Sequence, residues 1–209
     1  MLTVHHLNNS RSQRVLWLLE ELGLEYQLKT YQRDPETNLA PPELEQVHPL
    51  GKSPVLTDDD ATIIESGAII DYILRHYGAG RLQPETGTHS HEQYMQWLHY
   101  AEGSAMLPLM LKMYTARLGD AGAPLQPRIA DELQRHLGYL ENALEGVDWL
   151  VDNSFSGADI QLSFVVEIAP LLYSLETLPN IAAYRQRLHQ RPAYSAALER
   201  GGFYAYGSS

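Results

Sequence analysis

The sequence predicts an α/β domain followed by an all-α helical bundle, and two patterns along the 209 residues support this fold class. Over residues 1–78, short apolar and β-branched runs alternate with stretches whose apolar residues recur at helical spacing. From His91 onward, only the helical spacing is found. We therefore expect a first domain over residues 1–78, a linker rich in Gly, Pro and Thr over 79–88, and a helical domain over 89–209.

The first domain is expected to contain its elements in the order β-α-β-α-β-β-α. The strands are predicted at residues 2–7, 25–31, 54–57 and 61–64. The helices are predicted at residues 15–24, 40–47 and 66–77. A right-handed crossover makes the first two strands parallel, and the polar turn at residues 58–60 makes the last two an antiparallel hairpin. This order is the topology of the thioredoxin-like fold.

The second domain is expected to be helical throughout. Its helices are predicted at residues 91–118, 127–144, 158–175 and 179–190, with a short one after Pro192. Ser156 and Asp159 have the spacing of a capping box, with Asp in place of the usual Glu. The helix that follows is apolar on nearly all sides, so we expect it to be the buried central helix of this domain.

The composition excludes several classes of function. A net charge of −11 without a basic block argues against a surface that binds nucleic acid through its phosphates. Neither a signal peptide nor an apolar run long enough to span a bilayer is found, so we expect a cytoplasmic protein without a membrane partner. The chain has no cysteine, which excludes disulfides, cysteine-bound zinc and attack by a protein thiol. Any sulfur chemistry must therefore use a sulfur that a ligand brings.

The N-terminus of the first predicted helix holds Asn9-Ser10-Arg11-Ser12. Unpaired backbone N–H groups and the helix dipole favour an anion at such a position, and a thiolate is one such anion. Ser10 adds a hydroxyl that can donate to a bound sulfur, and Arg11 either adds positive potential or extends into solvent. The alternative is that Ser10 or Ser12 only caps the helix.

Two further positions suit a short peptide with an amino-acid head group. Ser53 lies directly before Pro54, and if the bond between them is cis, the Ser53 backbone is free to pair with an extended peptide. The alternative is an ordinary proline on an edge strand. Ser66 at a helix N-terminus suits a carboxylate and Glu65 suits an ammonium group, although Ser66 taken alone is also explained as an N-cap.

Three segments, taken in order, resemble the N-terminal signatures of cytosolic glutathione transferases of the serine type found in bacteria and fungi. They are Ser10-x-x-x-Arg14-Val15, His48-Pro-Leu-Gly-Lys-Ser-Pro-Val-Leu56 and Glu65-Ser-Gly-Ala-Ile69. The chain order, the linker and the capping box are similar too, so the resemblance covers essentially the whole chain. It implies a homodimeric detoxification enzyme that uses glutathione as a co-substrate.

The resemblance also implies roles for individual residues. Ser10 would activate the glutathione thiol. The implied glutathione-binding residues are Lys52, Ser53, Pro54, Glu65 and Ser66. Among these, Glu65 and Ser66 would hold the γ-glutamyl end, and Lys52 would reach a carboxylate. Ser53 would pair with the cysteinyl backbone, and although the family usually has Val or Ile there, pairing through main-chain atoms should survive the change.

A stripe of methionines at helical spacing is the remaining candidate for a binding surface. It consists of Met106, Met110 and Met113, with Tyr114 adjacent. By itself such a stripe indicates a helix core. The resemblance instead implies a second-substrate pocket against this helix, with Met106, Met110 and Tyr114 as its residues. The spacing of the histidines does not suit a metal site, so none is expected.

The leading interpretation is a transferase that directs the glutathione thiolate at an electrophilic or peroxide substrate. One alternative is a glutathione-binding protein with little catalysis, whose helical domain serves a protein partner. Another is a glutathione-dependent disulfide reductase, which would have to rely on ligand sulfur because the chain has no thiol of its own.

Overall fold

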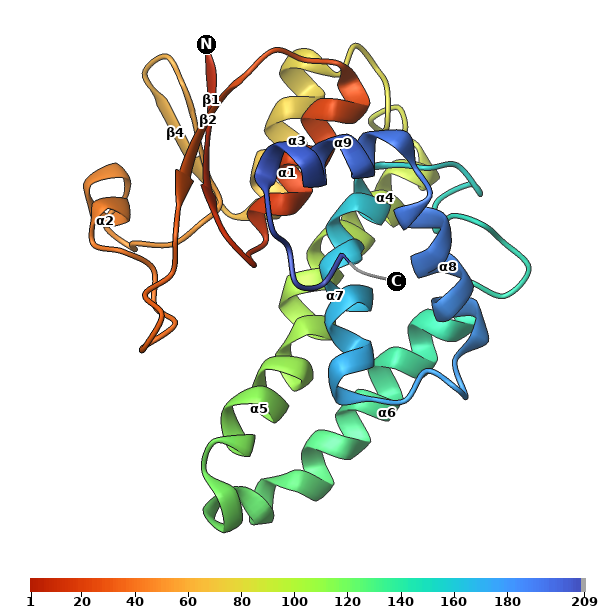
Figure 1. Cartoon of the computed structure of the whole chain (residues 1–209). Helices are drawn as coiled ribbons and strands as arrows, with labels where there is room; N and C mark the ends of the chain where they lie inside the picture. The colour runs from red at the N-terminus through yellow and green to blue at the C-terminus, as the bar shows by residue number, and fades with distance from the viewer. Residues whose placement is uncertain (208–209) are drawn as a thin grey trace. The chain divides into compact units, whose positions relative to one another are not determined.

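The computed structural model describes residues 1–207 and contains two compact units (Figure 1). One unit consists of residues 1–82 together with residues 189–207, and the other consists of residues 83–188. The division expected from the sequence differs, because it assigned all residues from 89 onward to the helical domain. The residues from His189 on are instead part of the unit that contains the sheet.

The first unit contains a four-stranded mixed sheet in the order β2-β1-β3-β4. The strands are β1 (Leu2–Leu7), β2 (Gln27–Tyr31), β3 (Val55–Asp58) and β4 (Ala61–Ile64). Strand β1 pairs parallel with β2 and antiparallel with β3, and β3 and β4 form the hairpin. The predicted thioredoxin-like order and strand directions are therefore confirmed.

The helices of the first unit are α1 (Ser12–Leu22), α2 (Glu43–Val47), α3 (Ser66–Tyr77) and α9 (Pro192–Gly201). Residues 15–19 of α1 have no exposed surface, because β1, α3 and α9 all pack against this helix. Gly23 ends α1 with φ 64°, a left-handed C-cap that glycine adopts without steric cost. Burial on several sides keeps the N-terminus of α1 in a fixed place.

Helix α9 is attached to α1 by an aromatic contact and an ion pair. The Tyr194 and Trp17 rings meet edge to face with centroids 5.1 Å apart. The Arg191 guanidinium donates to both carboxylate oxygens of Glu21, at 2.6 and 2.8 Å. These contacts explain why the C-terminal residues belong to the unit with the sheet.

The second unit is helical, as predicted. Its main helices are α4 (His89–Tyr100), α5 (Met106–Ala116), α6 (Gln126–Ala143) and α7 (Gly157–Leu172), and α8 (Pro179–His189) follows them. A π-helical turn at Ala101–Ala105 separates α4 from α5 and so interrupts the helix predicted over residues 91–118, and a 3₁₀ segment, Gly119–Leu125, leads into α6. Helix α7 is buried from Gly157 to Ala169, so it is the predicted central helix. The capping box at its start is also confirmed.

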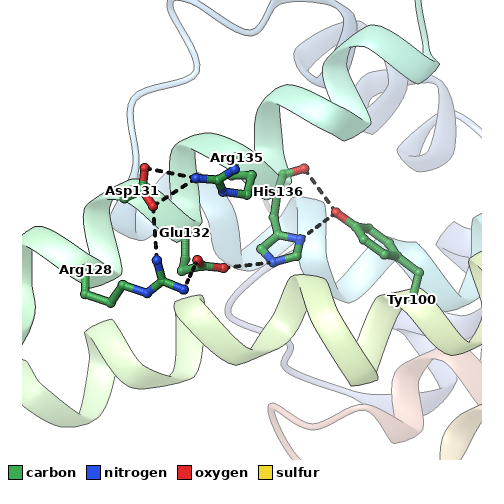
Figure 2. A network of polar contacts seen from close by, with 6 residues as sticks. All are labelled: Tyr100, Arg128, Asp131, Glu132, Arg135 and His136. Carbon is green, nitrogen blue, oxygen red and sulfur yellow. Dashed lines mark hydrogen bonds and ion pairs between the residues drawn. The ribbon is translucent and has the colours of Figure 1, made fainter.

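A chain of polar contacts joins the end of α4 to α6 (Figure 2). The Tyr100 hydroxyl lies 3.0 Å from His136 Nδ1, and His136 Nε2 lies 3.3 Å from Glu132. Glu132 in turn pairs with Arg128 at 2.6 Å. Arg128 is largely exposed, and exposed ion pairs contribute at most about 1 kcal/mol, so the outer part of this series of contacts adds little stability.

Within residues 1–207, no helix combines the length and apolar character needed to cross a bilayer.

Candidate functional site

Ser10 lies in the turn between β1 and α1, two residues before the helix begins. Its side chain is buried, with 4% of its surface exposed. Ser10 Oγ accepts the backbone N–H of Ser12 at 3.2 Å, so it binds one N–H group of the first helical turn. Arg11 occupies the N-cap position and forms no side-chain capping bond. The Ser10 hydroxyl thus has the position of a capping group, and its own O–H can be donated either to Ser12 Oγ, 2.7 Å away, or to a bound ligand.

The backbone of this turn is held from two directions. The Arg33 guanidinium donates to the carbonyl oxygens of Asn8 and Asn9, at 3.1 and 3.3 Å. On the side-chain side, Asn9 Oδ1 accepts the backbone N–H of Ala205 at 2.8 Å. Asn9 has a φ of 50°, in the left-handed region that asparagine tolerates better than most residues. Ser10 is therefore attached to a fixed turn.

Three serine hydroxyls and one imidazole form a continuous polar cluster around Ser10. The Oγ atoms of Ser10 and Ser12 are 2.7 Å apart, and Ser12 Oγ lies 2.8 Å from His6 Nδ1. Ser53 Oγ lies 3.5 Å from Ser10 Oγ and donates to the His5 carbonyl at 2.8 Å. Two of the predicted site residues, Ser10 and Ser53, are thereby brought together from positions 43 apart in the chain.

His6 and Ser12 were not predicted as part of the site. His5 and His6 are neighbours on β1, so their side chains point to opposite faces of the strand, and their partners differ accordingly. His5 Nδ1 lies 2.8 Å from the Tyr31 hydroxyl, whereas His6 Nδ1 faces Ser12. Burial lowers the pKa of His6 to about 4, so the ring is neutral at pH 7 and takes part as a hydrogen-bonding group.

The lowered pKa of His6 predicts a specific acid sensitivity. The unfolded chain binds this proton near pH 6.5 and the folded chain only near 4, so stability present above pH 6.5 is lost as the pH falls through this window. The difference between these two pKa values corresponds to about 3 kcal/mol in the free energy of unfolding. Denaturant titrations at a series of pH values should therefore show a flatter profile for His6→Asn, which cannot titrate, than for the wild type. Parallel profiles for the two proteins would contradict the assignment.

A second group of predicted residues lies at the start of α3. Ser66 is the first residue of this helix, its side chain is 3% exposed, and it accepts a hydrogen bond from Arg14 Nη1 at 3.2 Å. Glu65 precedes it with φ 67° and ψ 117°, a conformation that costs a non-glycine residue about 1–3 kcal/mol. Such strain concentrates at sites that bind ligands. The strained backbone of Glu65 at the N-terminus of α3 therefore supports a binding role for this turn.

Arg14 is a further residue whose role the sequence left open. It lies on α1 with 1% of its surface exposed, so a charged guanidinium is buried next to Ser66. The available signal was an arginine on a helix whose other residues are largely apolar, since arginine is rarely buried without a partner. Its charge favours a carboxylate at the start of α3.

Lys52, Ser53 and Pro54 precede β3. The Ser53–Pro54 bond is cis, Pro54 is buried, and Lys52 is exposed. Among residues 1–207, the N–H and C=O groups of Ser53 form no backbone hydrogen bond. The main chain of Ser53 is thus available for pairing with a ligand backbone.

The methionine stripe lies on α5, in the second unit. Met106 is 2% exposed and belongs to the core of that unit. Met110 is half-buried and Tyr114 is 55% exposed, so these two side chains have surface available to a ligand. Within residues 1–207, no group of three or more His, Cys, Asp or Glu side chains lies close enough together to hold a metal ion.

The residues of the first unit offer complementary binding groups for one zwitterionic peptide. The turn at Glu65 and Ser66 offers an acceptor for an ammonium group and donors for a carboxylate. Ser53 offers a main-chain donor and acceptor, and Ser10 offers a hydroxyl donor at the N-terminus of α1. These features suit an α-amino-acid head group, a peptide backbone and an anionic side chain, in that order.

Comparisons with known proteins identify relatives along nearly the whole chain. The family model described as glutathione S-transferase, N-terminal domain, matches residues 1–75, and that of the C-terminal domain matches residues 100–192. Glutathione S-transferase 1 of Saccharomyces cerevisiae is 32% identical, with 96% of this chain and 95% of the yeast protein covered. A glutathione S-transferase structure from Actinobacillus pleuropneumoniae is 34% identical, with a TM-score of 0.91 over 100% of this chain and 97% of that one. A sphingomonad glutathione S-transferase complexed with glutathione is 25% identical, with a TM-score of 0.79 over 96% and 99% of the two chains.

Proposed function

The chain belongs to the glutathione S-transferase family, and we propose that its Ser10 hydroxyl stabilises the thiolate of bound glutathione for attack on an electrophile. The activity is glutathione transfer, as in the relatives of that name. Glutathione is the co-substrate, and it is present in the related sphingomonad structure.

One observation supports the role of Ser10 above the others. Ser53 and Ser10 are neighbours, with their Oγ atoms 3.5 Å apart. A cysteinyl residue whose backbone pairs with Ser53 therefore places its side chain in the region of Ser10. The sulfur then lies near the N-terminus of α1, where the helix dipole and the hydroxyl both favour the anion.

The energies involved are sufficient for useful activation. Lowering the pKa of a thiol by about two units from roughly 8.5 requires about 2.7 kcal/mol in favour of the thiolate. A hydrogen bond to a charged acceptor supplies about 1.5–3 kcal/mol, and a helix N-terminus about 0.3–1 kcal/mol more. The hydroxyl is therefore the larger contribution. No proton acceptor on the protein is needed, since the thiol can lose its proton to water.

The other end of glutathione is assigned to the start of α3. Ser66 and the first N–H groups of the helix receive the γ-glutamyl carboxylate, with the charge of Arg14 behind them. Glu65 receives the ammonium group. Lys52 is exposed, and its ammonium group is assigned to the remaining carboxylate of glutathione, that of the glycyl end. Fixing the tripeptide at both ends leaves the sulfur little freedom near Ser10, and such positioning contributes to the rate.

The second substrate is assigned to the side chains of α5 that have exposed surface. Met110 and Tyr114 are proposed to contact the apolar part of an electrophile, for which the adaptable methionine side chain is suited. Met106 supports them from the core.

We further propose a cytoplasmic homodimer, in line with the family and with a sequence that lacks cysteine. Peroxide substrates remain within the same chemistry, because a thiolate attacks both electrophilic carbon and peroxide oxygen.

The proposed function predicts the following result with purified protein. The protein should be retained on immobilised glutathione and should conjugate glutathione to a generic aryl halide, with a rate that rises with pH until the bound thiol is ionised. Retention without turnover across halides, epoxides and hydroperoxides would instead favour a binding protein. Faster turnover of glutathionylated peptides than of any electrophile would favour a disulfide reductase.

A further inference from the structure

The C-terminal end of the described chain returns to the turn that carries Ser10. The backbone N–H of Ala205 donates to Asn9 Oδ1 at 2.8 Å, although 196 positions separate the two residues. Asn9 directly precedes Ser10 and has a φ of 50°, a conformation that few side chains accept. This hydrogen bond therefore fixes the residue whose backbone decides the direction in which the Ser10 side chain leaves the turn.

A second connection runs from Gly201 to Ser10 through two side chains. The His6 ring lies against the backbone of Gly201, and its Nδ1 lies 2.8 Å from Ser12 Oγ. Ser12 Oγ lies 2.7 Å from Ser10 Oγ. His6, Ser12 and Ser10 are all at most 4% exposed, so water competes little for these contacts.

The packing at Gly201 is tight enough to hold the imidazole in place. A Cβ added there would lie 3.3 Å from His6 Cε1 and 3.0 Å from Gln13 Oε1. The absence of a side chain at Gly201 is what allows its backbone to approach the ring. The two connections thus reach Ser10 by separate routes, one through its backbone neighbour and one through its hydroxyl.

We propose that residues 201–205 position the Ser10 hydroxyl, with Asn9 and His6 as the positioning residues that transmit the C-terminal contacts to it. The inference rests on the proposed role of Ser10 as the donor to the glutathione sulfur. Asn9 and His6 act through Ser10 and need not touch glutathione. A hydroxyl that is free to rotate donates to the sulfur for only part of the time, so breaking either connection lowers the thiolate population and the rate.

The first connection can be broken from either partner. Asn9→Gly keeps the left-handed backbone and removes the acceptor. Ala205→Pro removes the donor, and Ala205 is the second residue of the turn closed by the Gly207 N–H and the Tyr204 carbonyl, where proline is readily accepted. Each variant should lower kcat for aryl-halide conjugation about tenfold and raise the pKa of the bound glutathione thiol, with the KM for glutathione within about twofold of wild type.

A double-variant cycle tests whether the two changes break one interaction. If they do, the variant carrying both Asn9→Gly and Ala205→Pro should lose no more activity than either single variant. Thiolate formation is followed by the ultraviolet absorbance of the bound tripeptide as a function of pH. Independent losses that multiply would show that the two residues are not coupled and would overturn the proposal for this connection.

Asn153→Gly is the matched control. Asn153 also has a φ near 50°, and its Oδ1 accepts the backbone N–H groups of Asp148 and Trp149, but it lies in the second unit. This variant should lose stability in a thermal melt and leave the thiol pKa unchanged. A shift of the thiol pKa in Asn153→Gly as large as that in Asn9→Gly would show that the effect follows from general destabilisation.

The second connection is tested at His6. His6→Leu should lower kcat and raise the pKa of the bound thiol, because Ser12 loses its partner at Nδ1. His6→Asn, whose amide lies near the position of Nδ1, should recover part of both losses. Equal losses in the two variants would overturn the positioning role of His6.

The outcomes separate this inference from the proposed function. If Ser10→Ala itself leaves the rate and the thiol pKa unchanged, the proposed role of Ser10 fails. If Ser10→Ala has a large effect but folded Asn9→Gly, Ala205→Pro and His6→Leu proteins all behave as wild type, only the positioning by the C-terminal segment fails. If Asn9→Gly does not fold, Ala205→Pro tests the same hydrogen bond, because Ala205 lies at an exposed position.

Discussion

Replacing Ser10 by alanine should lower kcat/KM for conjugation by roughly 10- to 100-fold, because the variant lacks the hydrogen bond that stabilises the thiolate. The pKa of the bound glutathione thiol should move back towards its free value of about 8.5. The residual rate reflects the N-terminus of α1 and the positioning of the tripeptide, neither of which the substitution removes. Retention on immobilised glutathione should therefore persist.

The measurement combines a pH–rate profile with titration of the bound thiol. In the Ser10→Ala protein the rate should continue to rise at pH values where the wild type has reached its plateau, so the deficit should shrink as the pH is raised. Ser195→Ala is a suitable control, because Ser195 is an exposed serine on α9 of the same unit. A Ser10→Ala protein with the wild-type plateau would show that another group ionises the thiol.

Much of the fold could be predicted, because local signals agree with the tertiary structure. The strand at Leu2–Leu7 and the hairpin around Asp59 follow from apolar runs and a polar turn. The end of α1 follows from Gly23, whose left-handed backbone is the usual way for a helix to stop. The capping box at Ser156 marked the start of α7 in the same manner. Each of these features depends on neighbours within a few residues.

The features that the sequence did not reveal depend on distant partners. The periodicity of α9 indicates that one face is buried, but not that Tyr194 packs on Trp17 of α1 rather than on another helix. The π-helical turn at Ala101–Ala105 consists mostly of small residues, which continue the helical spacing on either side, so the spacing alone did not reveal the interruption. These two points account for the different division of the chain and for the interrupted helix.

The same distinction holds at the site. The positions of Ser10, Ser53 and Ser66 in their turns could be foreseen from chain order and from the resemblance to a known family. The link from Ser12 to His6 could not, because it needs the separation of β1 and α1 in space. The hydrogen bond between Ala205 and Asn9 joins the two ends of the described chain, and no local pattern indicates such a contact.

The largest effect on stability is expected at Asp159, in the capping box of α7. Its carboxylate has no exposed surface and accepts four hydrogen bonds. The donors are the Ser156 N–H at 2.8 Å, the Ser156 hydroxyl at 3.1 Å, the Leu150 N–H at 3.3 Å and the Tyr184 hydroxyl at 2.8 Å. Asp159→Ala leaves these donors buried without a partner, and each such group costs about 1–3 kcal/mol.

We therefore expect Asp159→Ala to lower the free energy of unfolding by about 3–5 kcal/mol, a large share of the 5–15 kcal/mol typical of a folded protein. Denaturant titration should show a lower midpoint with an unchanged slope. Asp131→Ala provides the comparison, since Asp131 on α6 is half exposed and pairs only with surface arginines, at a cost of at most about 1 kcal/mol. Equal losses of unfolding free energy in the two variants would contradict this expectation. They would mean that the apolar burial of α7, the central helix of the second unit, fixes where the helix begins without the capping box.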